Sequence, residues 1–156
     1  MAFASPIDQR YFEDYVPGDV HTFGSILVDA DEVMSFAKRY DPQAFHTDRE
    51  AAKRTPFGGL IASGWHTAGL MMRLYYEHFL THVASFGSPG ISELRWLKPV
   101  RPGDELSARV TVLEARPSKS KPDRGLVTSL VEVLNQANEV VMTLNVVNIM
   151  GRRPQD

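Results

Sequence analysis

The chain has 156 residues, of which 43% are hydrophobic, and its formal net charge at pH 7 is −2. This length suits one domain with a substantial core and is short for two, and the near-neutral charge argues against a nucleic-acid partner. Cysteine is absent, which excludes disulfides, thiolate nucleophiles and cysteine-ligated metal sites.

No apolar run approaches the roughly 18 to 20 residues that are needed to cross a bilayer. The first residues also lack a basic stretch followed by an apolar one, which is the pattern of a secretory signal. We therefore expect a cytoplasmic protein that makes no membrane contact.

The first part of the chain predicts an extension, a strand and a helix. Residues 1–20 are rich in proline, aspartate and aromatic residues, and residues 21–28 are expected to form the first strand. Asp29 precedes Glu32 by three residues, which is a helix-start pattern. The helix is predicted to end where Asp41 begins, and its apolar spacing predicts one buried face that is made of Val33, Phe36, Ala37 and Tyr40.

A polar segment follows this helix. Asp41 and His46 are five residues apart, and Pro42 disfavours a plain helix between them. A carboxylate and an imidazole held together can share the activation of one water molecule. The simpler alternative is that Asp41 ends the helix, that His46 is a loop histidine and that Gly58 and Gly59 are hinges. Residues 48–53 are expected to add one or two helical turns whose charges are solvated.

The longest periodic element is a helix predicted from about residue 61 to about residue 82. Its first turn contains Ser63 and Gly64, and helix starts present free N–H groups that can polarise a carbonyl group. Because Gly64 has no side chain, a substrate atom could approach its N–H closely. The periodic apolar positions predict the core-facing side of this helix; they are Ile61, Trp65, Ala68, Met72, Tyr76, Phe79, Leu80 and Val83.

The second half of the chain predicts strands at residues 91–97, 105–115, 125–134 and 140–150, separated by turn signals. A tail is expected over residues 150–156. One long helix and a series of antiparallel strands argue for the α+β class, and no internal repeat or second-domain boundary is visible.

Other candidate sites carry less weight. His78 and His82 are four residues apart on the predicted helix, but no third metal ligand accompanies them, so no metal site is expected. Arg95, Lys98 and Arg101 could contact the phosphate groups of a ligand, although an ordinary charged surface is the preferred explanation. Ser63 could cap the helix or touch a substrate.

The motifs Asp41-Pro42-Gln43-Ala44-Phe45-His46 and Pro56–Gly64 resemble those of the MaoC-like family of R-specific enoyl-CoA hydratases and dehydratases, which have the hot-dog fold. Tyr40, Gln43 and Ala44 differ from the family's usual glycine, asparagine and proline, and Met72 stands where some members have a serine. The segment 97–106 is similar to a turn of hot-dog proteins, so the resemblance covers most of the chain.

The resemblance implies a curved antiparallel sheet wrapped around the long helix, in a single domain over residues 1–156 that forms at least a homodimer. It also implies the reversible addition of water to a trans-2-enoyl thioester, with the CoA ester as the expected form, to give an R-3-hydroxyacyl product. Asp41 and His46 correspond to the acid/base pair, and Gly64 corresponds to the glycine whose N–H holds the thioester oxygen.

Gln43, Ser63, Trp65 and His66 are the predicted substrate contacts. No cofactor is expected, because the thioester itself acidifies the α-position. Two alternatives stay open: a hot-dog acyl-CoA thioesterase, and a non-catalytic subunit that binds acyl-CoA or a partner protein.

Overall fold

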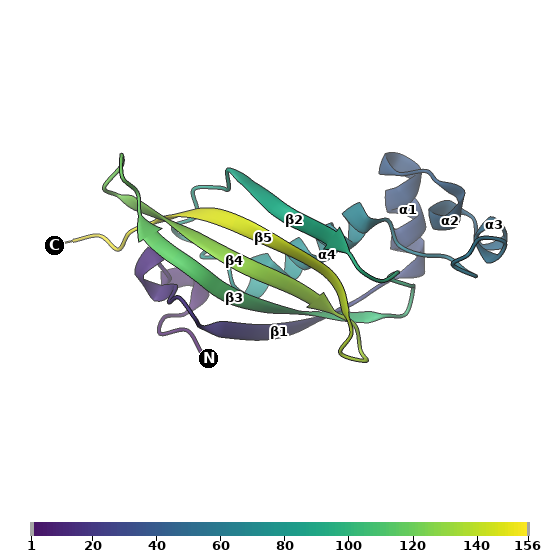
Figure 1. Ribbon diagram of the computed structural model, residues 1–156, viewed down its shortest axis with the longest axis horizontal. Coiled ribbons are helices and arrows are strands. Elements are labelled where there is room, and N and C mark those ends of the chain that lie inside the picture. Colours follow the sequence, from purple (N-terminus) through teal and green to yellow (C-terminus); the bar gives the residue numbers. More distant parts are fainter. Residues whose placement is uncertain (1, 156) are drawn as a thin grey trace.

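A five-stranded antiparallel sheet forms the main body of the protein (Figure 1). The computed structural model describes residues 2–155, so positions 1 and 156 of the predicted extension and tail lie outside the described residues. The strand order is β1-β3-β4-β5-β2, which leaves β1 and β2 at the edges. The strands are β1 (Val20–Leu27), β2 (Gly90–Trp96), β3 (Glu105–Pro117), β4 (Arg124–Leu134) and β5 (Val140–Gly151). The α+β prediction is confirmed, and every predicted strand lies within two residues of its observed bounds.

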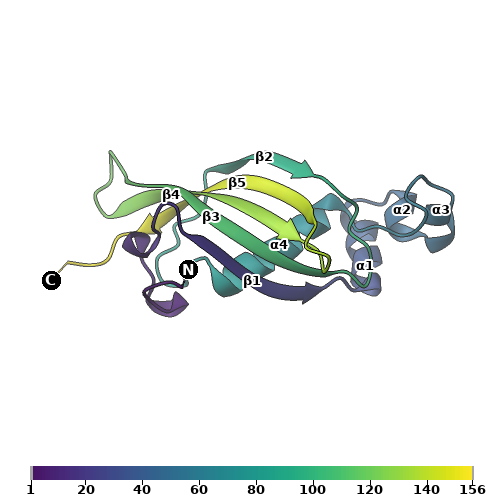
Figure 2. The same ribbon diagram turned by 60° about the horizontal axis from the view of Figure 1, so that its bottom comes forward.

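One long helix covers a single face of the sheet, while three shorter helices gather at one end (Figures 1 and 2). The helices are α1 (Ala30–Tyr40), α2 (Ala44–Thr47), α3 (Arg49–Lys53) and α4 (Gly64–His78), and short 3-10 turns precede β1 at Ile7–Gln9 and Phe12–Asp14. None of the helices in residues 2–155 is both long and apolar enough to cross a membrane. Two layers therefore form the body of the protein, with α1 to α3 beyond one end of the sheet.

Helix α1 begins and ends as predicted. The Asp29 side chain accepts a hydrogen bond from the Glu32 N–H, which satisfies one of the free donors of the first turn. Val33 and Ala37 are buried, but Tyr40 is 63% exposed, so the predicted buried face was wrong at its last position. The physical reason is that the helix stops there and the Tyr40 ring lies against Phe36 and beneath Arg39 at the surface.

Helix α4 is shorter than predicted at both ends. At its start, the N–H groups of Ile61 and Ala62 bond to the carbonyls of Phe45 and Val100, which keeps these residues extended. At its end, the Arg10 guanidinium donates to the carbonyls of His78 and Phe79. Tyr15 donates to the Phe79 carbonyl as well. The N-terminal segment thus satisfies the last carbonyls of α4, and the helix does not continue to residue 82.

The prediction of the core-facing side of α4 was wrong at four of its eight positions; Ile61, Phe79 and Leu80 are buried as predicted, and Ala68 packs against the core. The buried helical residues are His66, Thr67, Leu70, Met71, Leu74 and Tyr75. Of the predicted core positions, Trp65 is 58% exposed, and Met72, Tyr76 and Val83 are exposed as well. The helix carries two apolar faces, and the more regular of them points away from the sheet.

Candidate active site

Asp41 lies at the junction between α1 and α2. Its backbone N–H ends α1 by bonding to the Ala37 carbonyl, and its side chain reaches two hydrogen-bond donors. Gln43 Nε2 lies 2.8 Å from Asp41 Oδ1, and Ser63 Oγ lies 2.7 Å from Asp41 Oδ2. The hydrogen bond from Gln43, the hydrogen bond from Ser63 and the nearby His46 lower the pKa of Asp41 against a smaller opposing effect of burial. The carboxylate is therefore held ionised and in a fixed orientation.

His46 lies on the single turn of α2 and is 5% exposed. Its Nδ1 atom is 2.7 Å from the Ile61 carbonyl oxygen. A carbonyl oxygen can only accept, so the neutral ring must carry its hydrogen on Nδ1. The lone pair is then on Nε2, which lies 3.3 Å from Asp41 Oδ2. The pair thus places a carboxylate oxygen and a basic nitrogen next to each other.

The start of α4 faces this pair. Ser63 is fully buried, and its Oγ accepts a hydrogen bond from the Trp65 N–H while it donates to Asp41. It is therefore a helix cap that also anchors the carboxylate. The Gly64 N–H follows as the first donor of the helix, and such donors have no partner within the helix.

The side-chain space at Gly64 is filled by Trp96. A Cβ atom at this position would lie 2.3 Å from the indole of Trp96, and Trp96 Nε1 donates to the Gly64 carbonyl at 2.9 Å. Glycine is thus required because β2 lies against the helix start, and not because open space is left for a substrate. Gly64 nevertheless lines the cavity.

One cavity of about 490 Å³ brings these groups together. Asp41, His46 and Gly64 all line it, as do two predicted substrate contacts, Gln43 and Trp65. The rest of its wall is mainly apolar and comes from the 57–67 segment, from the last residue of β2 and from the residues after it: Phe57, Ile61, Ala62, Thr67, Trp96, Leu97, Lys98, Pro99 and Val100. A carboxylate, an imidazole and a helix N–H in one mainly apolar cavity can activate water beside a polarised carbonyl group.

A family model described as "MaoC like domain" matches residues 14–135. The chain belongs to this family. It is 43% identical to a MaoC-like dehydratase from Rhodospirillum rubrum, whose crystal structure matches with a TM-score of 0.86 over 94% of this chain and 99% of that one. It is 34% identical to a 3-hydroxybutyryl-CoA dehydratase of Methylorubrum extorquens, over 71% of this chain and 69% of that one.

The MaoC-like chain is also similar to an (R)-hydratase from A. caviae involved in PHA biosynthesis. The identity is 26%, the TM-score is 0.70, and the match covers 89% of this chain and 97% of that one. The predicted hot-dog fold is confirmed by these structural neighbours, and a MaoC-like hydro-lyase is the class of enzyme that the comparisons indicate.

Two predicted substrate contacts of this MaoC-like domain do not line the cavity. His66 does not line the cavity; its ring stacks on Phe36 at 5.0 Å, and its Nε2 lies 3.0 Å from Glu32 Oε1. It joins α1 to α4 within the core. Ser63 contacts Asp41 and is absent from the cavity wall.

The three predicted basic residues have separate partners. Arg95 pairs with Glu93, and Arg101 donates to the Phe57 carbonyl at 2.7 Å, which fixes the segment before α4. Lys98 is the member that lines the cavity, and it pairs with Glu139. They do not form a single cationic patch.

The predicted helical pair of histidines is also separated. His78 is the last residue of α4 and stacks on Phe23, whereas His82 lies beyond the helix and stacks on Tyr76. Among residues 2–155, no group of three histidine, aspartate or glutamate residues is arranged to hold a metal ion.

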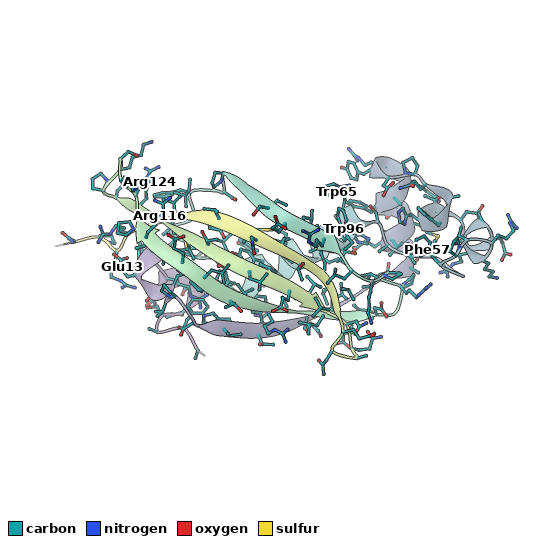
Figure 3. All side chains as sticks on the ribbon, viewed as in Figure 1. Glu13, Phe57, Trp65, Trp96, Arg116 and Arg124 are labelled. Carbon is teal, nitrogen blue, oxygen red and sulfur yellow. The ribbon has the colours of Figure 1, made fainter. Side chains whose placement is uncertain are left out.

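Sequence reasoning missed part of the cavity wall of the MaoC-like domain. Trp96 and Phe57 line it (Figure 3 labels both, together with Trp65, at the helical end of the sheet), and the Trp65 and Trp96 rings meet edge to face at 5.2 Å. The two tryptophans beside a small polar cluster were the signal available in the sequence, because aromatic side chains are enriched at binding surfaces.

Proposed function

We propose that this chain catalyses the reversible hydration of a trans-2-enoyl thioester, as its CoA ester, to an R-3-hydroxyacyl thioester. The observation that carries the proposal is that Asp41, His46 and Gly64 line one cavity. Membership of a family with dehydratase and hydratase relatives supports the same class of reaction.

In this mechanism one water molecule donates its two hydrogens to Asp41 and to His46 Nε2. The Ile61 carbonyl holds the other ring hydrogen on Nδ1, so Nε2 is free to take a proton from the water as its oxygen attacks C3. The same nitrogen then returns a proton to C2 on the same face, and the net result is syn addition of water. Asp41 stays ionised and stabilises the imidazolium that forms in between.

The Gly64 N–H is proposed to donate to the thioester oxygen, on which negative charge develops when C3 is attacked. A donor of this kind contributes roughly 3 to 4 kcal/mol to transition-state stabilisation. Gln43 and Ser63 act on the substrate indirectly, because both donate to Asp41. Trp65 and Trp96 would flank the pantetheine arm, and Lys98 would lie nearest to the phosphates of coenzyme A.

We also propose that two copies of the chain form a homodimer through β2 and the outward face of α4. Edge strands offer unpaired backbone groups to a partner strand, and all of β2 except Leu94 is exposed. Exposed apolar side chains on both elements supply the contact area, and they include Trp65, Met72, Tyr76, Ile91 and Trp96. In this proposal each copy is a single hot-dog domain, and the dimer acts on acyl-CoA in the cytoplasm, as in fatty acid metabolism.

The dimer is tested by measuring solution mass. Wild type should have twice the 17.5 kDa of the chain, and Tyr76→Glu should dissociate at least tenfold more readily because it buries an unpaired charge. Leu113→Glu makes the same kind of change at an exposed leucine of β3 and should leave the dimer intact. A monomeric wild type at micromolar concentration would contradict the assembly.

The reaction is tested with crotonyl-CoA. Loss of the conjugated enoyl absorbance and formation of R-3-hydroxybutyryl-CoA are expected for wild type. Asp41→Asn and His46→Ala should each lower kcat by roughly 10²- to 10⁴-fold, with folding checked by circular dichroism. Release of free thiol without a change in enoyl absorbance would indicate a thioesterase instead. Thermal stabilisation by acyl-CoA without turnover would indicate a binding subunit.

A further inference from the structure

A second cavity of about 340 Å³ lies between α4, β2 and β5. Its wall is mostly apolar and includes Met71, Met72, Leu80, Ile91, Leu144 and Val146. None of the residues of the proposed catalytic site lines it. It is a separate cavity on the inner side of the sheet, and the proposed catalytic steps involve none of its residues.

This second cavity follows the first along the same two elements. On α4, Thr67 lines the first cavity and Met71, one turn later, lines the second; on β2, Trp96 lines the first and Ile91 lines the second. Because a helix rises about 1.5 Å per residue, Tyr75 is roughly 16 Å along α4 from Gly64. A thioester whose oxygen is held at Gly64 would therefore send an acyl chain along α4 toward the second cavity.

The far end of this cavity is polar. Tyr75 and Asn148 both line it and both are buried, and the Tyr75 hydroxyl donates to Asn148 Oδ1 at 2.5 Å. Burial raises the pKa of Tyr75, so the phenol keeps its hydrogen. The Asn148 Nδ2 group donates to no other group within residues 2–155, and it is not among the side-chain atoms that are fully closed off from solvent, so it is open to the cavity. An apolar chain that filled the cavity would leave this donor without a partner, which is unfavourable, whereas a ligand oxygen would accept from it.

The charge of the wall limits the kind of oxygen. No lysine, arginine or histidine is among the described residues that line the second cavity. A carboxylate placed there would lose its hydration without gaining a counter-charge. A hydroxyl, keto or ether oxygen carries no such penalty and can accept from Asn148.

We propose that the second cavity binds the distal part of the acyl group and that Asn148 donates to an uncharged oxygen near its end. This inference rests on the proposed hydratase function and specifies its substrate class. An extended chain advances about 1.2 Å per bond, since three backbone bonds span about 3.5 Å. Roughly a dozen carbons therefore connect the thioester at Gly64 with Asn148.

The test compares three substrates: crotonyl-CoA, trans-2-dodecenoyl-CoA and ω-hydroxy-trans-2-dodecenoyl-CoA. Wild type should hydrate the ω-hydroxy substrate with a kcat/KM about tenfold or more above that of the dodecenoyl substrate, because a buried donor left unpaired rejects the analogue. Asn148→Leu should remove this preference and leave crotonyl-CoA hydration within about twofold, since the short chain does not reach the second cavity.

Asn145→Leu is the matched control, because Asn145 lies on the same strand but does not line the cavity. It should keep the preference. Equal rates for the two long substrates in wild type, or an unchanged preference in Asn148→Leu, would overturn the inference. Hydration of crotonyl-CoA in the same experiment would still support the proposed function, so the two failures can be told apart. Binding of ω-hydroxydodecanoyl-CoA and dodecanoyl-CoA to wild type, measured by calorimetry, tests the same preference without turnover or a variant; equal affinities would overturn it.

Discussion

Replacing Ser63 with alanine tests how the site and the fold depend on one hydroxyl group. Ser63 Oγ lies 2.7 Å from Asp41 Oδ2 and 3.3 Å from the Trp65 N–H. Loss of a helix cap costs about 1 kcal/mol. Loss of a hydrogen bond to a charged group costs about 1.5 to 3 kcal/mol, reduced here because the Asp41 side chain is 19% exposed and water can replace the donor. We expect Ser63→Ala to lower the free energy of unfolding by about 2 to 3 kcal/mol near neutral pH, measured in urea.

The pH dependence separates the two contributions. The pKa of Asp41 is lowered in the folded state, so its stabilisation is present above the unfolded pKa of about 3.9 and is lost as the pH falls through the folded pKa. The difference between wild type and Ser63→Ala should therefore shrink to the cap contribution of about 1 kcal/mol in acid. Ser35→Ala, at an exposed serine of α1, is the control and should change little. A loss below 0.5 kcal/mol, or one that does not vary with pH, would refute the reasoning; a cost that small is about what an ordinary surface change produces.

Three further substitutions have defined outcomes. Gly64→Ala should drive its Cβ into Trp96 and lower the unfolding free energy by about 1 to 3 kcal/mol, with part of the loss recovered in the double variant with Trp96→Ala. Arg10→Met should cost about 2 to 4 kcal/mol in urea unfolding, because it removes one buried and one partly buried hydrogen bond to the carbonyls at the end of α4; a loss under 1 kcal/mol would contradict the capping role. Gln43→Ala removes the main cause of the lowered pKa of Asp41, so the pKa of the Asp41 carboxyl group, measured by NMR titration, should rise; an unchanged pKa would exclude Gln43 as the orienting group.

The strands and the start of α1 could be predicted because their signals are local. Asp29 caps α1 by accepting a hydrogen bond from Glu32, only three residues later. The alternation of buried and less buried residues along β4 follows from its own sequence, without knowledge of the neighbouring strands. Asp41 and His46 could be paired from spacing and from the resemblance, and they lie 3.3 Å apart. Their roles as catalytic groups remain a proposal.

The orientation of α4 could not be predicted from periodicity. Both of its faces are apolar, and a periodic pattern does not say which face meets the sheet and which points away from it. The end of α4 was missed for a related reason, since Arg10 and Tyr15, which satisfy its carbonyls, are more than sixty residues away in sequence.

The contact between Gly64 and Trp96 is likewise invisible in a linear pattern. It exists because β2 pairs with β5 and is thereby brought against the start of α4. Gln43, a predicted substrate contact, lines the cavity, and its amide also donates to Asp41, a contact that was not predicted. Side-chain direction within a turn depends on neighbours that the sequence alone does not identify.

A double-mutant cycle on kcat/KM for crotonyl-CoA hydration tests most directly whether Asp41 and His46 act on one water molecule. Groups that act as a unit give non-additive losses, so Asp41→Asn combined with His46→Ala should be no slower than the more damaging single variant by more than about threefold. Losses that multiply, each independent of the other, would contradict a shared site at this pair.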